Sequence, residues 1–229
     1  MQTEAKEEVK LHGFWASSDC AMVRHALKLK GVAYDYVEVD IDIRSDSLVR
    51  VYENVPVLVV DGQSVTNPLV IFEFIEDNWK YPALFPEDPY MKSRVRFWAG
   101  FFYKKLMPTS FAIMFSEGEA QEKATEEFIE HMRTMEDGIA VDFANGGPFI
   151  NGKEPGLLDV VMGSCSNGLK ALGAVPGVQM LDKERMPVLS SAIEAFIGLE
   201  TSTVIPYDEL LELHWVLREI GLATASSKA

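Results

Sequence analysis

Residues 55–68 read VPVLVVDGQSVTNP, and this stretch decides the fold. Its apolar run, the Asp61-Gly62 turn and a second short run predict an antiparallel β-hairpin. The pair Asn67-Pro68 then opens a helix that extends to Trp79, because Asn is a good N-cap and proline suits the first helical position. A hairpin followed at once by a helix indicates the last part of a small α/β domain.

The residues before the hairpin predict a strand, a helix and a second strand. Residues 9–13 alternate between apolar and polar, which is typical of a half-buried strand. Capping residues at 17–19 open a helix over 20–30, and residues 33–40 form the next alternating run. The short crossover implies two parallel strands. With a short helix over 44–52, the predicted order is β-α-β-α-β-β-α, ending near residue 80.

The residues after the hairpin and its helix are proline-rich and then helical. Residues 81–90 contain three prolines and are interpreted as a linker. We expect a long helix over Arg94–Ile113 that Pro108 kinks or breaks, and further helices over 117–137 and 157–172. The predicted organisation is a first domain at 1–84, a linker at 85–91 and a helical domain at 92–229.

Composition excludes several classes of function. The 229 residues carry 21 Lys and Arg against 35 Asp and Glu, a formal charge of −14, which argues against nucleic acid or an anionic membrane as partner. No apolar run is long enough to span a membrane, and no leader precedes the first strand. The two cysteines favour a reduced, cytoplasmic compartment. No His, Cys or Asp cluster has metal-ligand spacing, so no metal is expected.

Seven short motifs in this order resemble the plant tau-class glutathione transferases. They are Gly13-Phe14-Trp15-Ala16-Ser17, Val23-Arg24-His25-Ala26-Leu27, Val55-Pro56-Val57-Leu58, Phe74-Ile75-Glu76-Asp77-Asn78-Trp79, Asp88-Pro89-Tyr90, Arg96-Phe97-Trp98-Ala99 and Gly156-Leu157-Leu158-Asp159-Val160. The resemblance covers roughly residues 9–220. It implies a thioredoxin-like α/β domain followed by an all-helical domain, and a homodimer.

The resemblance also implies a glutathione site in the first domain. A serine at the start of the first helix, here Ser17, lowers the pKa of the glutathione thiol by a hydrogen bond and by the helix dipole. An ordinary N-cap is the alternative interpretation of Ser17. The positions that match the family's glutathione-binding residues are Ser17, Arg44, Asn54, Val55, Asn67 and Pro68. A cis peptide bond is expected at Val55-Pro56.

Two departures from the family pattern predict weakened glutathione binding. Glu53 or Asn54 stands where the family keeps a lysine for the glycine carboxylate. Asn67-Pro68 replaces Glu-Ser, and proline offers neither a hydroxyl nor an N–H to the γ-glutamyl carboxylate. The alternative is that Asn67-Pro68 is only a good helix start and that Val55, Asn67 and Arg44 still hold the peptide.

The family's second substrate site is a hydrophobic pocket, and here its expected lining is unusually apolar. Asp19 follows Ser17 closely and is either a general acid or base or, more simply, a helix-capping carboxylate. Cys20 is expected to be a packed thiol. The residues from Met107 to Phe115 also fit plain core packing. The expected lining is Phe14, Trp15, Asp19, Met107, Phe111, Met114, Phe115, Gly168, His214 and Trp215.

Three functions follow from the resemblance and its departures. The leading hypothesis is a protein that binds or transforms a bulky hydrophobic plant metabolite, with glutathione conjugation weakened or lost. A glutathione-independent transformation would make it an isomerase or lyase that uses Ser17 and Asp19. The second is a working glutathione transferase in which Ser17 activates the thiol of the cosubstrate. The third is a ligandin or carrier without catalysis.

Overall fold

A computed structural model describes residues 8–39, 55–144 and 146–226, without the side chains of 224–226. The chain divides into two compact units, Met1–Ala83 and Leu84–Ala229. The predicted division placed residue 84 in the first domain and a linker at 85–91. In the structure residue 84 belongs to the second unit, and a helix begins at Pro89, inside that predicted linker. The helix expected over 44–52 lies outside the described residues.

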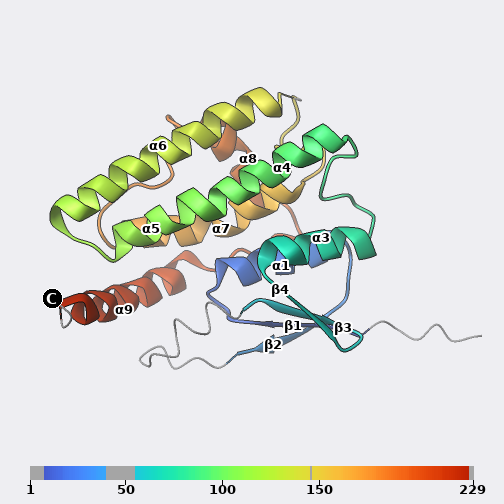
Figure 1. Ribbon diagram of the computed structural model, residues 1–229, viewed down its shortest axis with the longest axis horizontal. Helices are drawn as coiled ribbons and strands as arrows, with labels where there is room; N and C mark the ends of the chain where they lie inside the picture. Colours follow the sequence, from blue (N-terminus) through green and yellow to red (C-terminus); the bar gives the residue numbers. More distant parts are fainter. Residues whose placement is uncertain (1–7, 40–54, 145, 227–229) are drawn as a thin grey trace, which may run out of the picture. The chain divides into compact units, whose positions relative to one another are not determined.

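The first unit is a four-stranded sheet with helices on one face (Figure 1). The strand order is β2-β1-β3-β4, with β1 and β2 parallel and the other neighbours antiparallel, as the crossover and the hairpin predicted. The described elements are β1 (Val9–Gly13), α1 (Ser18–Leu29), β2 (Asp35–Glu38), β3 (Val57–Val60), β4 (Gln63–Thr66) and α3 (Pro68–Asn78).

Helices α1 and α3 cover the sheet with their apolar faces. Leu27 of α1, Leu58 of β3 and Ile71 of α3 are fully buried in this core. At the end of α1 the ammonium of Lys30 lies 2.6 Å from a carboxylate oxygen of Glu76 on α3, and the lysine side chain is fully buried. A buried charge of this kind needs its partner, so the pair holds the end of α1 against α3.

The second unit is built from α-helices and one π-helical turn. The long helix expected over Arg94–Ile113 is interrupted by this turn, and Pro108 lies in the first turn of the helix that follows. Helix α6 runs beside α4 and α5 (Figure 1), and α7 contacts α4, α5, α8 and α9. The elements are α4 (Pro89–Phe101), the π-helix η1 (Phe102–Leu106), α5 (Met107–Met114), α6 (Gly118–Asp142), α7 (Leu157–Ala174), α8 (Pro187–Ile197) and α9 (Tyr207–Ser226).

One buried carboxylate organises the start of α7. The two oxygens of Asp159 accept hydrogen bonds from the backbone N–H groups of Gly156 (2.9 Å), Ile150 (2.7 Å) and Asn151 (3.2 Å). Burial raises the pKa of Asp159 to about 6, while these hydrogen bonds act in the opposite direction. The carboxylate therefore joins the loop before α7 to the first turn of this helix.

We expect the substitution Asp159→Ala to destabilise the second unit strongly. It leaves three backbone N–H groups without their acceptor, and a loss of about 3 kcal/mol in the free energy of unfolding is the expected scale. Urea unfolding followed by circular dichroism measures it. The control is Asp137→Ala, because Asp137 is exposed and lies 3.7 Å from Arg133. Equal losses in the two variants would contradict this role.

Candidate functional site

Ser17 lies at the start of α1 as its N-cap. Its hydroxyl oxygen accepts a hydrogen bond from the backbone N–H of Cys20 at 3.3 Å, and the residue is only 2% exposed. Because a hydroxyl that accepts one hydrogen bond can also donate one, Ser17 can still give its proton to an anion. The positive end of the helix dipole lies at the same place. The residue therefore combines the two features that stabilise a thiolate.

The turn between β1 and α1 is closely packed around Gly13. A Cβ at this position would lie 2.9 Å from the sulfur of Cys20 and 3.0 Å from the hydroxyl of Tyr36, so only glycine fits without movement. The N–H of Phe14 donates to the same sulfur at 3.4 Å, and the N–H of Trp15 donates to Glu38 at 2.9 Å. These contacts hold the backbone that leads to Ser17.

Cys20 is a packed thiol, as predicted. It is buried, and this burial raises its pKa to about 11. A thiol with such a pKa is almost entirely protonated at neutral pH and is a poor nucleophile.

Asp19, beside Cys20 in the first turn of α1, is half-buried at a position where the helix dipole stabilises a carboxylate. Its role as an acid or base stays a prediction.

The start of α3 is closed by a side chain of its own segment. The amide oxygen of Asn67 accepts hydrogen bonds from the backbone N–H groups of Leu69 at 3.0 Å and Val70 at 3.4 Å. Asn67 has a positive φ of 70°, which Asn tolerates better than most residues, and Pro68 has no N–H. The donors at this helix terminus are thus partly occupied and partly missing.

The structure describes one of the three remaining residues predicted for the glutathione site. Val55 is buried and precedes Pro56 through a cis peptide bond, as expected. Arg44 and Asn54, together with Glu53, lie outside the described residues.

The ten residues expected to line a hydrophobic pocket are divided between the two units. Phe14 is buried and Trp15 half-buried at the end of β1. On α5, the rings of Phe111 and Phe115 stack at 6.4 Å with an interplanar angle of 16°, and they are 40% and 37% exposed. Met107 is half-buried, Met114 is fully buried in the core, and Gly168 is half-buried on α7. Asp19 is described above, and the last two residues lie on α9.

His214 and Trp215 point into different environments. His214 is buried, its Nδ1 has no hydrogen-bond partner among the described residues, and burial lowers its pKa to about 4. Trp215 is 49% exposed. His214 is therefore neutral at physiological pH and can exchange hydrogen bonds only as an uncharged imidazole.

Sequence reasoning missed the contacts that hold α9 against the end of α5. The guanidinium of Arg218 donates to the carbonyl of Met114 and, at 3.3 Å, to that of Ser116. A Cβ at Gly221 would lie 2.4 Å from the ring of Phe115, so α9 packs directly on this aromatic side chain. An Arg and a Gly in a helical segment carry no signal of such contacts.

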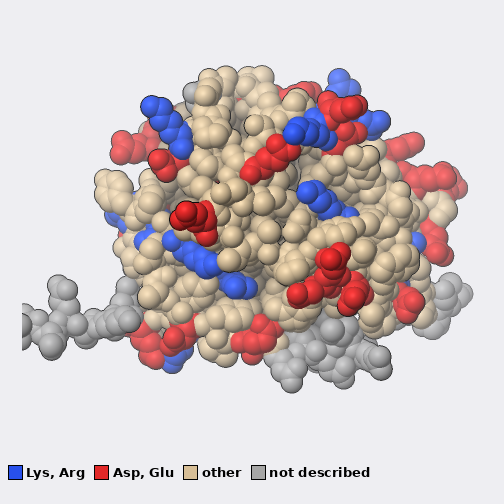
Figure 2. All heavy atoms as spheres, turned by 180° about the vertical axis from the view of Figure 1, so that it is seen from behind, with Lys and Arg blue, Asp and Glu red and all other residues tan. Residues whose placement is uncertain are grey.

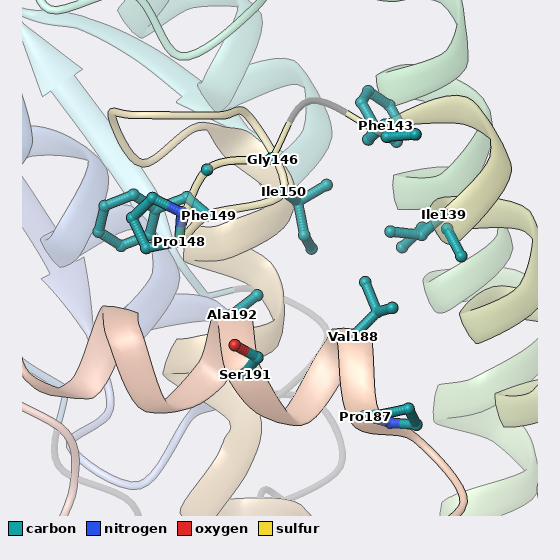
Figure 3. Close-up of a pocket in the computed structure, with 13 residues that line it drawn as sticks. Ile139, Phe143, Gly146, Pro148, Phe149, Ile150, Pro187, Val188, Ser191 and Ala192 are labelled. Atoms are coloured by element: carbon teal, nitrogen blue, oxygen red, sulfur yellow. The ribbon is translucent and has the colours of Figure 1, made fainter.

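An apolar pocket of about 360 Å³ lies between the end of α6, the loop that follows and the start of α8. Figure 3 shows Ile139, Ile150 and Val188 converging on it from these three segments. Among the described residues of its lining, Ser191 supplies the only side-chain polar group. None of the residues that the sequence singled out lines this pocket.

The charges on the described surface are of mixed sign. On the face in Figure 2, the Lys and Arg side chains stand singly or in short groups beside Asp and Glu. Across residues 8–39, 55–144 and 146–226, no group of His, Cys, Asp and Glu is arranged to hold a metal ion. No helix in those same ranges is long and apolar enough to cross a membrane.

Comparisons with known proteins agree with this fold. Residues 11–83 match the model of the glutathione S-transferase N-terminal domain. Glutathione S-transferase U10 of Arabidopsis thaliana is 36% identical over 230 residues, covering 98% of this chain and 99% of the relative.

Two solved structures are similar as well. The tau class glutathione S-transferase of mango has a TM-score of 0.82 at 29% identity, covering 92% of this chain and 98% of its own. A rice enzyme solved in complex with glutathione has a TM-score of 0.79 at 23% identity, covering 94% and 98%, which is a likeness of fold. The chain belongs to the glutathione S-transferase family, and its relatives place it in the tau class.

We expect the substitution Ser17→Ala to lower the free energy of unfolding of the first unit by about 1 kcal/mol, because the cap of α1 is lost. Urea unfolding of the whole chain measures the change. Ser18→Ala is the matched control, since Ser18 is already inside the helix and half-buried. If Ser18→Ala cost as much as Ser17→Ala, the assignment of Ser17 as the cap would be wrong.

Proposed function

We propose that this tau-class chain binds glutathione weakly and binds or transforms a bulky hydrophobic plant metabolite. The observation that carries the proposal is the closed start of α3. The Asn67 side chain occupies the N–H groups of Leu69 and Val70, and Pro68 removes a further donor. An anionic group of a ligand would have to compete with an acceptor that is already in place.

The expected weakening is large enough to matter for function. In the family pattern, a serine at the position of Pro68 gives its hydroxyl and its N–H to the γ-glutamyl carboxylate. Charge-assisted hydrogen bonds contribute about 1.5–3 kcal/mol each, so the loss of two would lower affinity by about two to four orders of magnitude. The overall charge of −14 acts in the same direction, because glutathione is an anion.

The exposed aromatic pair on α5 supports the hydrophobic part of the proposal. Phe111 and Phe115 present stacked rings at the end of α5, and the half-buried thioether of Met107 lies further along the same helix. Rings and thioethers favour flat, apolar ligands without requiring a charge. In this proposal Ser17 and Asp19 act on the ligand as a hydrogen-bond donor and an acid or base, as an isomerase or lyase requires.

A working transferase is the second candidate, and the geometry of Ser17 favours it. The hydroxyl lies at the N-terminus of α1 and can donate to a thiolate, and this does not depend on the hydrogen bonds of Asn67 at the start of α3. The rice relative was solved in complex with glutathione. For this chain, glutathione is a proposed cosubstrate under the second candidate and a weak ligand under the first.

We expect the cytoplasm as the compartment, where free cysteines such as Cys20 and Cys165 persist.

Calorimetric titration with glutathione separates the two candidates. We expect the wild-type chain to show no saturable binding at millimolar glutathione. The Pro68→Ser variant restores an N–H and a hydroxyl, and we expect it to bind at least tenfold more tightly, the effect of about 1.4 kcal/mol. A second variant, Asn67→Glu with Pro68→Ser, restores the family's Glu-Ser pair and frees the N–H groups of Leu69 and Val70.

The matched control for this titration is Pro89→Ser. Pro89 also occupies the first turn of a helix, behind the N-cap Asp88, so the change is chemically the same at a different helix start. It should leave glutathione binding unchanged. Micromolar binding by the wild-type chain would overturn the proposed weakness and favour the transferase. Equal affinity of the wild-type and Pro68→Ser chains would show that the start of α3 does not limit binding.

We further propose that the chain forms a homodimer and that α4 and α6 contribute to its interface. Phe97 on α4 is 50% exposed and Val141 on α6 is 80% exposed. They flank a cluster in which Asp142 accepts hydrogen bonds from Trp98 at 2.6 Å and Arg94 at 2.7 Å. Large apolar side chains on a rigid base are typical of a subunit interface.

The variants Phe97→Asp and Val141→Asp are expected to shift the chain toward monomer, because a carboxylate would have to be buried in the interface. Light scattering coupled to size-exclusion chromatography measures the mass. Val216→Asp is the control, at a valine of α9 with 40% exposure. A wild-type monomer, or dimers that survive both substitutions on α4 and α6, would contradict the assignment.

A further inference from the structure

A second pocket of the helical unit lies away from every residue assigned above. It has a volume of about 400 Å³ and is formed by α6 and by residues 179–186, the segment before α8. This volume is within the range of small-molecule sites in proteins. None of the residues expected to bind glutathione or the hydrophobic metabolite lines it.

The floor of this pocket is made of thioethers and one aromatic ring. Phe128 and Met132 come from α6, and Met180 and Met186 come from the opposite segment; all four are buried. Methionine side chains are polarisable and adapt their shape, and their sulfur atoms make favourable contacts with aromatic rings. The floor is therefore suited to a flat aromatic body.

The rim of the pocket carries both donors and acceptors. Arg133 lies 3.7 Å from Asp137 on α6, and Arg185 lies 3.3 Å from Asp182 on the opposite segment. Three of these four side chains are more than two-thirds exposed, and ion pairs of this kind contribute about 0–1 kcal/mol. The guanidinium groups can thus turn to a ligand at little cost. Because the two cations are balanced by two anions, the rim suits an uncharged ligand with polar groups.

A buried carboxylate joins α6 to the start of α8, directly after the segment that forms the opposite wall. Glu136 of α6 accepts hydrogen bonds from the backbone N–H groups of Val188 at 2.7 Å and Leu189 at 2.9 Å, at the start of α8. The preceding segment closes on itself, since the N–H of Met186 donates to the carbonyl of Asp182 at 2.9 Å. These contacts hold the segment before α8 against α6, which lowers the cost of organising this wall around a ligand.

We propose that this pocket binds a small, uncharged, hydroxylated aromatic molecule. Its ring lies on the floor formed by Phe128, Met132, Met180 and Met186. Its hydroxyl oxygen accepts a hydrogen bond from Arg133 or Arg185. The proposal does not rest on the glutathione site and holds under both candidate functions.

The test uses the full chain with ¹³C-labelled methionine methyl groups and 2-naphthol as the probe. The chain has ten methionines, and single Met→Leu variants assign the relevant signals. We expect the methyl signals of Met132, Met180 and Met186 to move upfield and to saturate, because the ring current of the probe shields them. Met107 reports on α5 in the same spectra. A probe bound at the aromatic pair on α5 would instead move the Met107 signal.

Two further measurements test the rim. In the first, the Arg133→Ala, Arg185→Ala double variant should bind 2-naphthol about tenfold more weakly than the wild-type chain does. In the second, the wild-type chain should bind naphthalene, which has no hydroxyl, more weakly than 2-naphthol by a similar factor. Lys183→Ala is the control, because Lys183 pairs with Glu194 at 2.7 Å and does not line the pocket. Shifts confined to Met107, no shift up to the solubility limit, or equal binding of the two probes would overturn the proposal.

Discussion

The first N–H groups of a helix need acceptors, and side chains of this chain supply them at four of the described helices. Ser17 caps α1, Asn67 caps α3 and Asp88 caps α4, while Glu136 accepts from the first turn of α8. Glu136 comes from a distance and joins α6 to α8, and Asp159, inside the first turn of α7, accepts in turn from the N–H groups of the loop before that helix. The same interaction therefore starts the helices and holds their neighbours in place.

The same constraint distinguishes the start of α1 from the start of α3 in the candidate glutathione site. Helix termini are the places where proteins of many kinds bind anions, and an acceptor side chain at the terminus competes with such a ligand. At α1 the acceptor is a hydroxyl, which retains a proton to give. At α3 the acceptor is an amide oxygen, and the residue that follows, Pro68, has no N–H to donate. Under the proposed function, the fold keeps one of its anion-stabilising positions and weakens another without a change in architecture.

Much of the first unit could be predicted from local sequence, because its signals are local. Residues 55–68 contain the turn pair and the helix start that define β3, β4 and α3, and the short crossover determined that β1 and β2 are parallel. In the second unit, Pro108 indicated an interruption of the long helix. The π-helical form of this interruption, at Phe102–Leu106 directly before Pro108, was not predicted. Both pockets of this unit were missed because each joins segments that are far apart in sequence and share no motif.

The tight turn at Gly13 has a consequence for the chemistry of the chain as a whole. The sulfur of Cys20 lies beside Gly13 and accepts a hydrogen bond from the N–H of Phe14, and burial keeps that thiol protonated. Cys165, the other cysteine of the sequence, is equally buried in the middle of α7. An electrophile that reaches this protein meets no exposed thiolate of the chain. The protein can therefore share a compartment with reactive molecules without being alkylated at its own cysteines.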